Sequence, residues 1–393
     1  MEDDCKPILN TGLRGVTVAS TKISDVIGAE GKLIYRGYLV PDLAAKTSFE
    51  EIIHLLLFEK LPNAQELAAF KQQLAAEREV PEQIIDALKT RPADALPMDI
   101  LQAATAMLAD HDKEAAELTQ EASMRKAVRL CAKLPTILAA WQRIRSNKEP
   151  VAPDANLDHA ANFLYMLFGQ QPDPDLVHFF DVALVLHAEH SFNASTFAAR
   201  EVASTRAHMY AAVSAAIGSL SGELHGGANV RVMQMLKEID SPDNVAAYVN
   251  KVLDEGKLIM GLGHAVYQTD DPRAHILAPM SKRAGEMAGD TRWYEISKIL
   301  EVEGKKAFKE HKGTDIFVNV DFYSASLYYS MGIPMDLYTP LFAISRVAGW
   351  TAHVLEEQFA GAAPKPMLYR PGSKYVGEYC GPEECSFVPI NER

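Results

Sequence analysis

The sequence predicts a mainly α-helical fold with a short β ribbon near the N-terminus. Apolar residues recur every three or four positions over several segments, each long enough to form a helix. Strand-like alternation is confined to residues 13–21 and 31–38. No repeat at a fixed period occurs, so a solenoid is not expected. The predicted helices cover residues 50–60, 65–77, 125–144, 175–190, 196–219, 244–253, 273–287, 293–311 and 338–358.

Composition and charge are those of an ordinary globular protein of one or two domains. The 393 residues exceed the size to which a single hydrophobic core usually grows. Hydrophobic residues make up 48% and charged residues 23%, and no apolar run approaches the ~20 residues that cross a bilayer. The formal net charge of -13 argues against nucleic-acid binding, which requires basic surfaces. We therefore expect neither a membrane nor a nucleic acid as partner.

The N-terminus and the cysteines favour a reducing, cytoplasmic location. The chain opens with Met1 followed by three acidic residues, unlike a signal peptide or a mitochondrial transit peptide. Four cysteines without a Cys-x-x-Cys pair are too few for a disulfide scaffold. Only Cys380 and Cys385 are close in sequence, and two free thiols are favoured there over a bridge or a metal clip.

Common signatures of nucleotide, hydrolase and metal sites are incomplete. Residues 261–263 begin like a dinucleotide fingerprint, but no strand precedes them and Val266 replaces the third glycine. Residues 218–222 resemble a nucleophile elbow with each serine one position off. His187 and His190 are three apart on a predicted helix, which is a weak metal signal without a third ligand. We expect no bound metal.

Two glycine clusters interrupt the helical pattern, at residues 218–227 and 256–263. His225 lies in the first cluster and His264 directly follows the second. Helix-breaking glycines beside a titratable side chain indicate a functional site rather than a core.

Two arginines are placed awkwardly for stability alone. Arg346 lies in an apolar helical segment whose neighbours carry no acid, so its guanidinium needs a carboxylate from elsewhere in the chain or from a ligand. Arg273 follows Asp271 and Pro272, which favour a helix start, so the helix dipole disfavours its positive charge. Either an anionic ligand lies at that helix start or the arginine extends into solvent.

Asp321 and His190 each have an ordinary structural interpretation. Asp321 stands where an apolar stretch meets a predicted helix and could be an N-cap. His190 ends a strongly apolar helix and could be a hydrogen-bonded core histidine. Considered singly, both structural interpretations would be preferred.

Seven segments taken together resemble, in order and spacing, the signature segments of citrate synthases. The likeness extends from Tyr35-Arg36-Gly37-Tyr38 almost to the C-terminus, and seven motifs in register are very specific. The segments are residues 187–196, 222–229, 261–267, 271–273, 319–324, 345–350 and 370–377.

The resemblance implies a Claisen-type condensation of acetyl-CoA with oxaloacetate, followed by hydrolysis of the thioester. Asp321 matches the catalytic base, His225 the histidine that hydrogen-bonds the thioester oxygen, and His264 the residue that polarises the oxaloacetate carbonyl. Acetyl-CoA is a co-substrate, and no tightly bound cofactor is implied. The residues matching the oxaloacetate-binding set are His190, Arg273, Arg346, Arg370 and, as an assisting residue, Asn193.

The resemblance also implies a homodimer of two-domain subunits. Residues 1–225 and 328–393 would form a large helical domain, and residues 226–327 a small mobile domain that closes on it. Arg370 matches an arginine lent across the dimer interface. The motifs do not identify the residues that hold the CoA phosphates, because Ala265, Gln268 and Gly372 depart from common family residues. The segment similar to the CoA-adenine loop consists of Lys257, Leu258, Ile259, Met260 and Gly261.

The choice of acyl group is left open by the motifs. 2-Methylcitrate synthases share the catalytic residues and use propionyl-CoA, which differs by one methylene, worth ~1 to 3 kcal/mol of discrimination. We favour acetyl-CoA because citrate synthases are the commoner members. A helical scaffold without turnover would be expected to have lost catalytic residues, and His225, His264 and Asp321 are all present.

Overall fold

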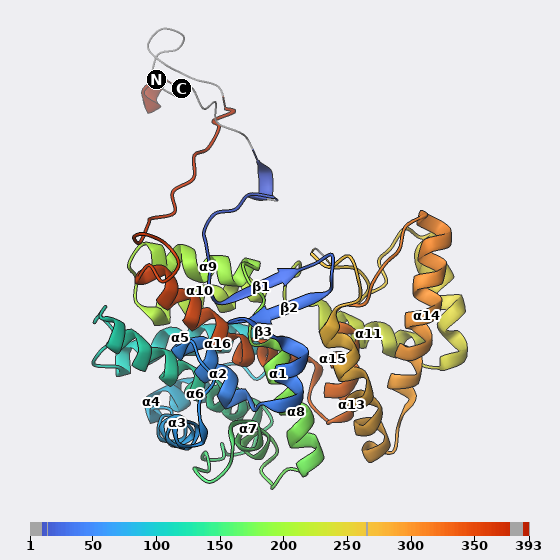
Figure 1. The fold of residues 1–393 in the computed structure, drawn as a ribbon, viewed down its shortest axis with the longest axis horizontal. Coiled ribbons are helices and arrows are strands. Elements are labelled where there is room, and N and C mark those ends of the chain that lie inside the picture. Colours follow the sequence, from blue (N-terminus) through green and yellow to red (C-terminus); the bar gives the residue numbers. More distant parts are fainter. Residues whose placement is uncertain (1–9, 14, 265, 378–387, 393) are drawn as a thin grey trace.

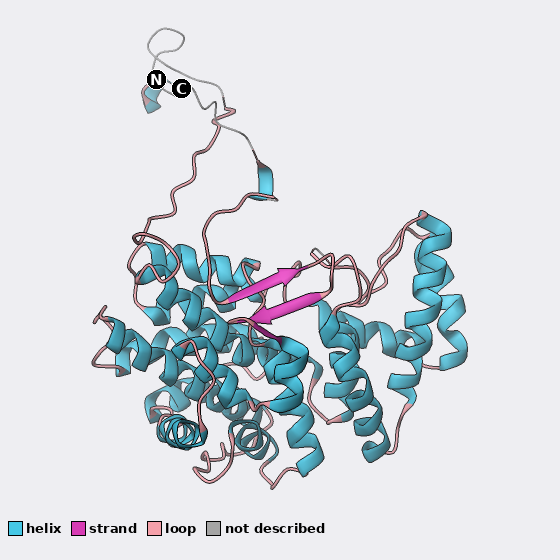
Figure 2. Cartoon of the chain, viewed as in Figure 1, coloured by secondary structure: helices cyan, strands magenta, loops and turns pink. Residues whose placement is uncertain are grey.

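The computed structural model describes residues 10–13, 15–264, 266–377 and 388–392. This part of the chain contains sixteen α-helices and one small three-stranded sheet, which agrees with the mainly α prediction (Figure 2). None of the described helices is long and apolar enough to cross a membrane. The helices are α1 (Val40–Lys46), α2 (Phe49–Phe58), α3 (Ala64–Ala76), α4 (Glu82–Lys89), α5 (Pro97–Met107), α6 (Gln120–Arg145), α7 (His159–Phe168), α8 (Pro174–His187), α9 (Ala194–Ser204), α10 (Met209–Leu220), α11 (Ala228–Ile239), α12 (Val245–Asp254), α13 (Pro272–Ala288), α14 (Arg292–Lys312), α15 (Asp321–Ser330) and α16 (Tyr338–Gln358).

Helix α16 is the centre of the larger group of helices (Figure 1). It packs against α2, α5, α6, α8, α9 and α10, and almost every residue along it is buried. A helix that is buried on all sides belongs in a core rather than at a surface. Trp350 on α16 and Trp141 on α6 are the largest fully buried side chains.

Helices α11 to α15 pack chiefly on one another and lie together to one side of the larger group in Figure 1. The loop that follows α12 crosses back over the start of α15. Leu262 pairs with Val318, and the Asn319 N–H donates to the Gly261 carbonyl oxygen at 2.9 Å. Gly261 has φ +81°, and a Cβ there would lie 2.7 Å from the Phe322 ring. This close approach brings the segment carrying His264 beside the first turn of α15.

The small sheet has the order β1-β2-β3 and is antiparallel throughout. The strands are β1 (Ser24–Ile27), β2 (Lys32–Tyr35) and β3 (Tyr38–Leu39). The strand predicted at residues 31–38 is confirmed, but the one predicted at 13–21 is wrong. Val16 and Val18 in that stretch are exposed, whereas Ile23, next to the true strand, is fully buried. The alternation in residues 13–21 therefore has no core to face.

Two helix boundaries also differ from the prediction. The helix predicted for residues 196–219 is two helices, because α9 ends at Ser204 and His208 caps α10 by accepting the Ala211 N–H at 3.2 Å. Helix α8 ends at His187, so His190 lies in the following loop rather than on the helix. Ser191 in that loop has φ +52°, which a continuing helix cannot contain.

Candidate active site

One cavity of about 630 Å³ brings together seven of the eight predicted catalytic and substrate-binding residues. They come from three loops, the first turn of α13, the first residue of α15 and the middle of α16, so segments far apart in sequence converge there. The cavity is also lined by Asp25 and Val26 of β1 and by Phe342 of α16, which sequence reasoning missed. The seven predicted residues are His190, Asn193, His225, His264, Arg273, Asp321 and Arg346.

The hydrogen bonds of His225 define its tautomer. The Ser195 N–H, in the first turn of α9, donates to His225 Nε2 at 3.2 Å, and Ser195 Oγ lies 2.8 Å from the same nitrogen. Nε2 therefore accepts, and the proton of the neutral ring is on Nδ1. Trp350 Nε1 donates to Ser195 Oγ at 3.2 Å, which fixes the serine. Ser195 was not predicted, because nothing in its local sequence indicates a contact with His225.

His264 has the opposite tautomer. Its Nδ1 accepts the backbone N–H groups of Val266 and Tyr267, at 3.0 and 3.1 Å. The proton of the neutral ring is therefore on Nε2, where it can be donated to a ligand. The His264 ring centroid lies 5.4 Å from that of His190 and 4.6 Å from that of Tyr267.

Burial keeps the cavity histidines neutral. Burial, aided by the positive charge of Arg346, lowers the pKa of His225 from 6.5 to about 4. Burial, aided by Arg273, lowers the pKa of His264 to about 4 as well. The pKa of His190 lies well below its ordinary value, chiefly through burial and the neighbouring Arg273. At neutral pH these rings can act as hydrogen-bond donors or acceptors without bringing positive charge.

Asp321 is a half-buried carboxylate with a raised pKa. Burial lifts the pKa of Asp321 from 3.8 to about 6, although Arg273 and Arg346 act in the opposite sense. The residue is the first of α15 and the N-cap position is taken by Val320, so the N-cap interpretation is wrong. The backbone N–H of Asp321 donates to Asn319 Oδ1 at 3.0 Å. A carboxylate that is ionised at pH 7 but poorly solvated is suited to act as a general base.

Arg346 is buried without an ion pair among the described residues. Only 1% of the residue is exposed, and its Nε donates to the His187 carbonyl oxygen at 2.8 Å. Burial lowers the pKa of Arg346 to about 10, although Glu189 opposes the change. These surroundings agree with the expectation from the sequence that no nearby acid neutralises the guanidinium. The remaining donors of Arg346 are available to an anion.

Arg273 is buried at the start of α13 and is 2% exposed, so the interpretation that it extends into solvent is wrong. It forms a two-pronged ion pair with Asp271, with Nε to Oδ1 at 2.9 Å and Nη2 to Oδ2 at 2.7 Å. Asp271 also caps the helix by accepting the Arg273 N–H at 3.0 Å. The aspartate offsets the unfavourable helix dipole and holds the guanidinium at the cavity wall.

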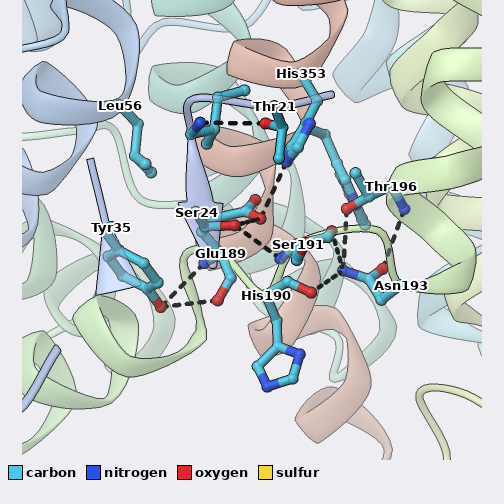
Figure 3. Close-up of polar contacts among 12 residues, drawn as sticks. Thr21, Ser24, Tyr35, Leu56, Glu189, His190, Ser191, Asn193, Thr196 and His353 are labelled. Carbon is cyan, nitrogen blue, oxygen red and sulfur yellow. Dashed lines mark hydrogen bonds and ion pairs between the residues drawn. The ribbon is translucent and has the colours of Figure 1, made fainter. Parts of the chain in front are cut away.

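His190 is presented by a tightly held loop (Figure 3). Ser24 Oγ donates to Glu189 Oε1 at 2.9 Å and accepts the Ser191 N–H at 3.0 Å. The Tyr35 hydroxyl accepts the Glu189 N–H at 3.2 Å. In the figure the His190 imidazole points away from these bonds, and within the described part of the chain its buried Nε2 has no hydrogen-bond partner. His190 therefore lines the cavity with this nitrogen unpaired, rather than lying in the core as a fully hydrogen-bonded histidine.

Asn193 lines the cavity but its amide is already engaged. It caps α9 by accepting the Thr196 N–H at 3.1 Å, and its Oδ1 also accepts the Ser195 hydroxyl at 2.8 Å. Its Nδ2 donates to Thr196 Oγ1 at 3.0 Å. Asn193 thus holds Ser195 against His225, and a direct contact with a ligand would require it to give up one of these bonds.

Several other predicted residues lie outside this cavity. Arg370 is exposed in the segment that leads away from the helices toward the C-terminus (Figure 1). None of the predicted CoA-adenine segment lines the cavity, and Lys257 forms an exposed ion pair with Glu255 at 2.6 Å. In that segment Leu258 is 73% exposed and Ile259 only 3%.

The weak metal hypothesis for His187 and His190 finds no support in their geometry. His187 Nδ1 lies 2.7 Å from the Ala183 carbonyl oxygen, and Glu189 is bonded to Ser24 and His353 instead. Among the described residues the only cluster of potential ligands is Asp270, His275 and Glu301. The Lys305 ammonium already lies between its two carboxylates, at 2.7 and 3.1 Å. Cys380, Cys385 and Ala265 lie outside the described residues.

Comparison with known proteins agrees with this geometry. A family model described as "Citrate synthase, C-terminal domain" matches residues 12–372. The citrate synthase of Haloferax volcanii is 46% identical to this chain, over 98% of this chain and 99% of its own. The 2-methylcitrate synthase of Mycobacterium tuberculosis is 40% identical, over 97% of this chain and 93% of its own.

Solved structures give the same result. The citrate synthase of Pyrobaculum aerophilum superposes with a TM-score of 0.90 at 37% identity, covering 100% of this chain and 97% of that one. The citrate synthase of Thermoplasma acidophilum, solved with carboxymethyl coenzyme A and oxaloacetate, also has a TM-score of 0.90, at 32% identity over 99% and 100%. The family model and the relatives cover nearly the whole chain. The chain belongs to the citrate synthase family.

Proposed function

We propose that this protein condenses acetyl-CoA with oxaloacetate and hydrolyses the resulting thioester to citrate and CoA. The observation that carries the proposal is a single cavity in which a carboxylate base, two neutral histidine donors of defined tautomer and an arginine without a counter-ion converge. A base, an enolate stabiliser and a clamp for a dianion are what this condensation requires.

Asp321 removes a proton from the methyl carbon of acetyl-CoA, and the Nδ1–H of His225 donates to the thioester oxygen as negative charge develops there. The carbon nucleophile then attacks the ketone carbon of oxaloacetate. The Nε2–H of His264 donates to the ketone oxygen and supplies the proton of the new hydroxyl group. Water finally cleaves the thioester and releases CoA. The neutral state of both histidines supports these roles, because an imidazolium would protonate the base.

We assign the binding of oxaloacetate to Arg346, Arg273 and His190. Among the described residues no acid occupies the remaining donors of Arg346, and none bonds the buried His190 Nε2. Both observations are explained by a carboxylate ligand, since an unpaired buried cation and an unsatisfied buried nitrogen are costly. Asn193 supports the site by holding Ser195.

Residues 226–327 are proposed as a small domain that closes on residues 1–225 and 328–393. Its helices pack chiefly on one another, and the cavity has walls from both parts. Closure would bring the CoA-adenine segment, Lys257 to Gly261, over the cavity mouth and exclude water. Small-angle scattering should show a smaller radius of gyration with oxaloacetate, and an unchanged radius would contradict closure.

A homodimer in which Arg370 completes the partner's site is part of the proposal. Arg370 is exposed and does not reach the cavity of its own chain. Mixing Arg370→Ala with Asp321→Asn subunits tests this directly. If the arginine is shared, each mixed dimer regains one site with both residues intact, so the mixture is more active than either variant. If Arg370 acts within its own chain, or if no dimer forms, no activity returns. The cytoplasmic location stays a prediction.

Release of the CoA thiol, with acetyl-CoA and propionyl-CoA compared at saturating oxaloacetate, tests the reaction and its acyl preference. One methylene in an apolar pocket is worth about 10- to 200-fold in kcat/KM, and we expect acetyl-CoA to be preferred within that range. Comparable values would favour the 2-methylcitrate synthase alternative, which the relative from M. tuberculosis keeps open. No thiol release with either substrate would refute the proposed function.

A further inference from the structure

The hairpin of β1 and β2 is tied at its base to the loop that presents His190. Ser24 at the start of β1 bonds both the Glu189 carboxylate and the Ser191 backbone (Figure 3). Tyr35 at the end of β2 donates to the Glu189 carbonyl oxygen at 2.9 Å and accepts the Glu189 N–H at 3.2 Å. Both Ser24 and Tyr35 are buried, at 8% and 0% exposed. The base of the hairpin and the His190 loop are therefore one rigid unit.

The tip of the same hairpin packs closely against the segment that follows His264. The Gly28 carbonyl oxygen accepts the Gln268 N–H at 2.9 Å. A Cβ on Gly28 would clash with the Val266 carbonyl oxygen, well inside the 3.0 Å that real Cβ atoms keep. On the other side of the turn, a Cβ on Gly31 would clash with Thr269 Oγ1.

The hairpin thus links the two histidine-bearing loops across the cavity. Asp25 and Val26, between its base and its tip, form part of the cavity wall. In Figure 1 the strands run from the larger group of helices toward the loops above α11 and α15. The His190 and His264 rings are in edge-on contact, with centroids 5.4 Å apart. Their separation therefore depends on a short, well-bonded strand pair.

We propose that the β1–β2 hairpin is a spacer that sets the position of His264 relative to His190, with Gly28 as the positioning residue at its tip. The inference rests on the proposed function, because the two histidines are assigned to the same substrate, oxaloacetate. The contact at Gly28 depends on one backbone hydrogen bond and on the absence of a Cβ, which allows the Val266 carbonyl oxygen to approach.

Gly28→Ala is the sharpest test. Gly28 is not among the glycines with positive φ, so alanine is compatible with its backbone and the change acts only through Val266. We expect kcat/KM for oxaloacetate to fall about ten- to a hundred-fold, as for a catalytic group displaced by up to an ångström. KM for acetyl-CoA should change less, because His225 and Asp321 are not held by the hairpin. Ala29→Ser, an exposed neighbour in the same turn, is the matched control and should behave like wild type.

Hydrogen exchange provides a readout that does not depend on turnover. In the substrate-free wild type the Gln268 amide should be protected, and in Gly28→Ala it should exchange faster, while the amides of α16 stay unchanged in both. If Gly28→Ala does not fold, Gly31→Asn presses on the same segment at Thr269, and asparagine tolerates positive φ.

The outcomes separate the two proposals. If the wild-type protein releases no CoA, the proposed function is refuted. The spacer can still be tested in that case, by comparing the oxaloacetate affinity of wild type and variant in calorimetry. A wild-type Gln268 amide that exchanges like a solvent-exposed one refutes the spacer. The spacer is also refuted if Gly28→Ala folds and leaves both the KM for oxaloacetate and the exchange of the Gln268 amide unchanged. If Gly28→Ala does not fold, the same result in Gly31→Asn refutes it. Selective loss of oxaloacetate affinity, with the melting temperature preserved, supports it.

Discussion

Replacing Asp321 by asparagine should abolish turnover and at the same time stabilise the protein. The cause is the burial that raises the pKa of this carboxyl from 3.8 to about 6. Each pKa unit corresponds to about 1.4 kcal/mol, so the ionised carboxylate costs the folded state about 3 kcal/mol at neutral pH. Asparagine has nearly the same shape and no charge, so it should recover most of that free energy.

The sign of the pH dependence makes this prediction specific. Because the folded pKa lies above the unfolded one, the protonated carboxyl is favoured in the folded state, and the cost is absent below about pH 4. It develops as the pH rises and is complete above about pH 7. The free energy of unfolding of Asp321→Asn should therefore match that of wild type at pH 4 and exceed it by about 3 kcal/mol at pH 8.

Urea or thermal unfolding at both pH values measures the difference. For a protein of this size, we expect the melting temperature at pH 8 to rise by about 5 °C. Asp243→Asn, at an exposed position outside the cavity lining, is the control and should show no such dependence. An Asp321→Asn protein that is no more stable than wild type at pH 8 would refute the idea of a desolvated base.

Other substitutions separate residues that serve catalysis from residues that serve the fold. Arg346→Met should raise the KM for oxaloacetate by at least about a hundred-fold in steady-state assays. The same substitution should raise the free energy of unfolding, because it replaces an unpaired buried cation by an apolar side chain. Gly349→Ala should destabilise by about 3 kcal/mol in urea titrations, since its Cβ would lie 2.5 Å from the Ala188 carbonyl oxygen and would also clash with Glu189. Tyr35→Phe should cost about 1 to 3 kcal/mol by the same measurement, because the buried Glu189 N–H loses its acceptor. Unchanged stability in either of the last two would contradict the packing described for the His190 loop.

The sequence was informative where residue type conflicts with local surroundings. Arg346 could be singled out because its helical neighbours are apolar, and it is indeed buried without an ion pair among the described residues. The second glycine cluster falls between helices, after α12, and the first does so from Gly222 onward, before α11, whereas Gly218 lies in the last turn of α10. Long helices such as α14 and α16 were predicted because apolar residues at helical spacing over some twenty residues are unambiguous.

Contacts between distant segments could not be predicted in this way. Ser195 looks like any residue in a helix's first turn, and only the folded chain places it against His225. A helix was expected to begin near Asp321, but periodicity did not delimit α15, because its sequence, rich in serine and aromatic residues, has a low helix propensity that tertiary packing overrides. The first strand was placed too early because alternation alone cannot distinguish an exposed stretch from a buried one.

The two arginines that would bind oxaloacetate also tune the base, which couples binding to chemistry. Arg273 and Arg346 both lower the pKa of Asp321, while burial raises it to a net value of about 6. A dianion held by these arginines cancels part of their field and excludes water, and both effects raise the pKa of Asp321 further. The pH profile of kcat/KM for oxaloacetate reports the free protein, whereas the profile of kcat/KM for acetyl-CoA at saturating oxaloacetate reports the complex. The acidic limb of the second profile should therefore lie at higher pH than that of the first. If the acidic limbs of the two profiles coincide, the charge of bound oxaloacetate does not change the pKa of Asp321. There would then be no electrostatic reason for oxaloacetate to bind before the base acts.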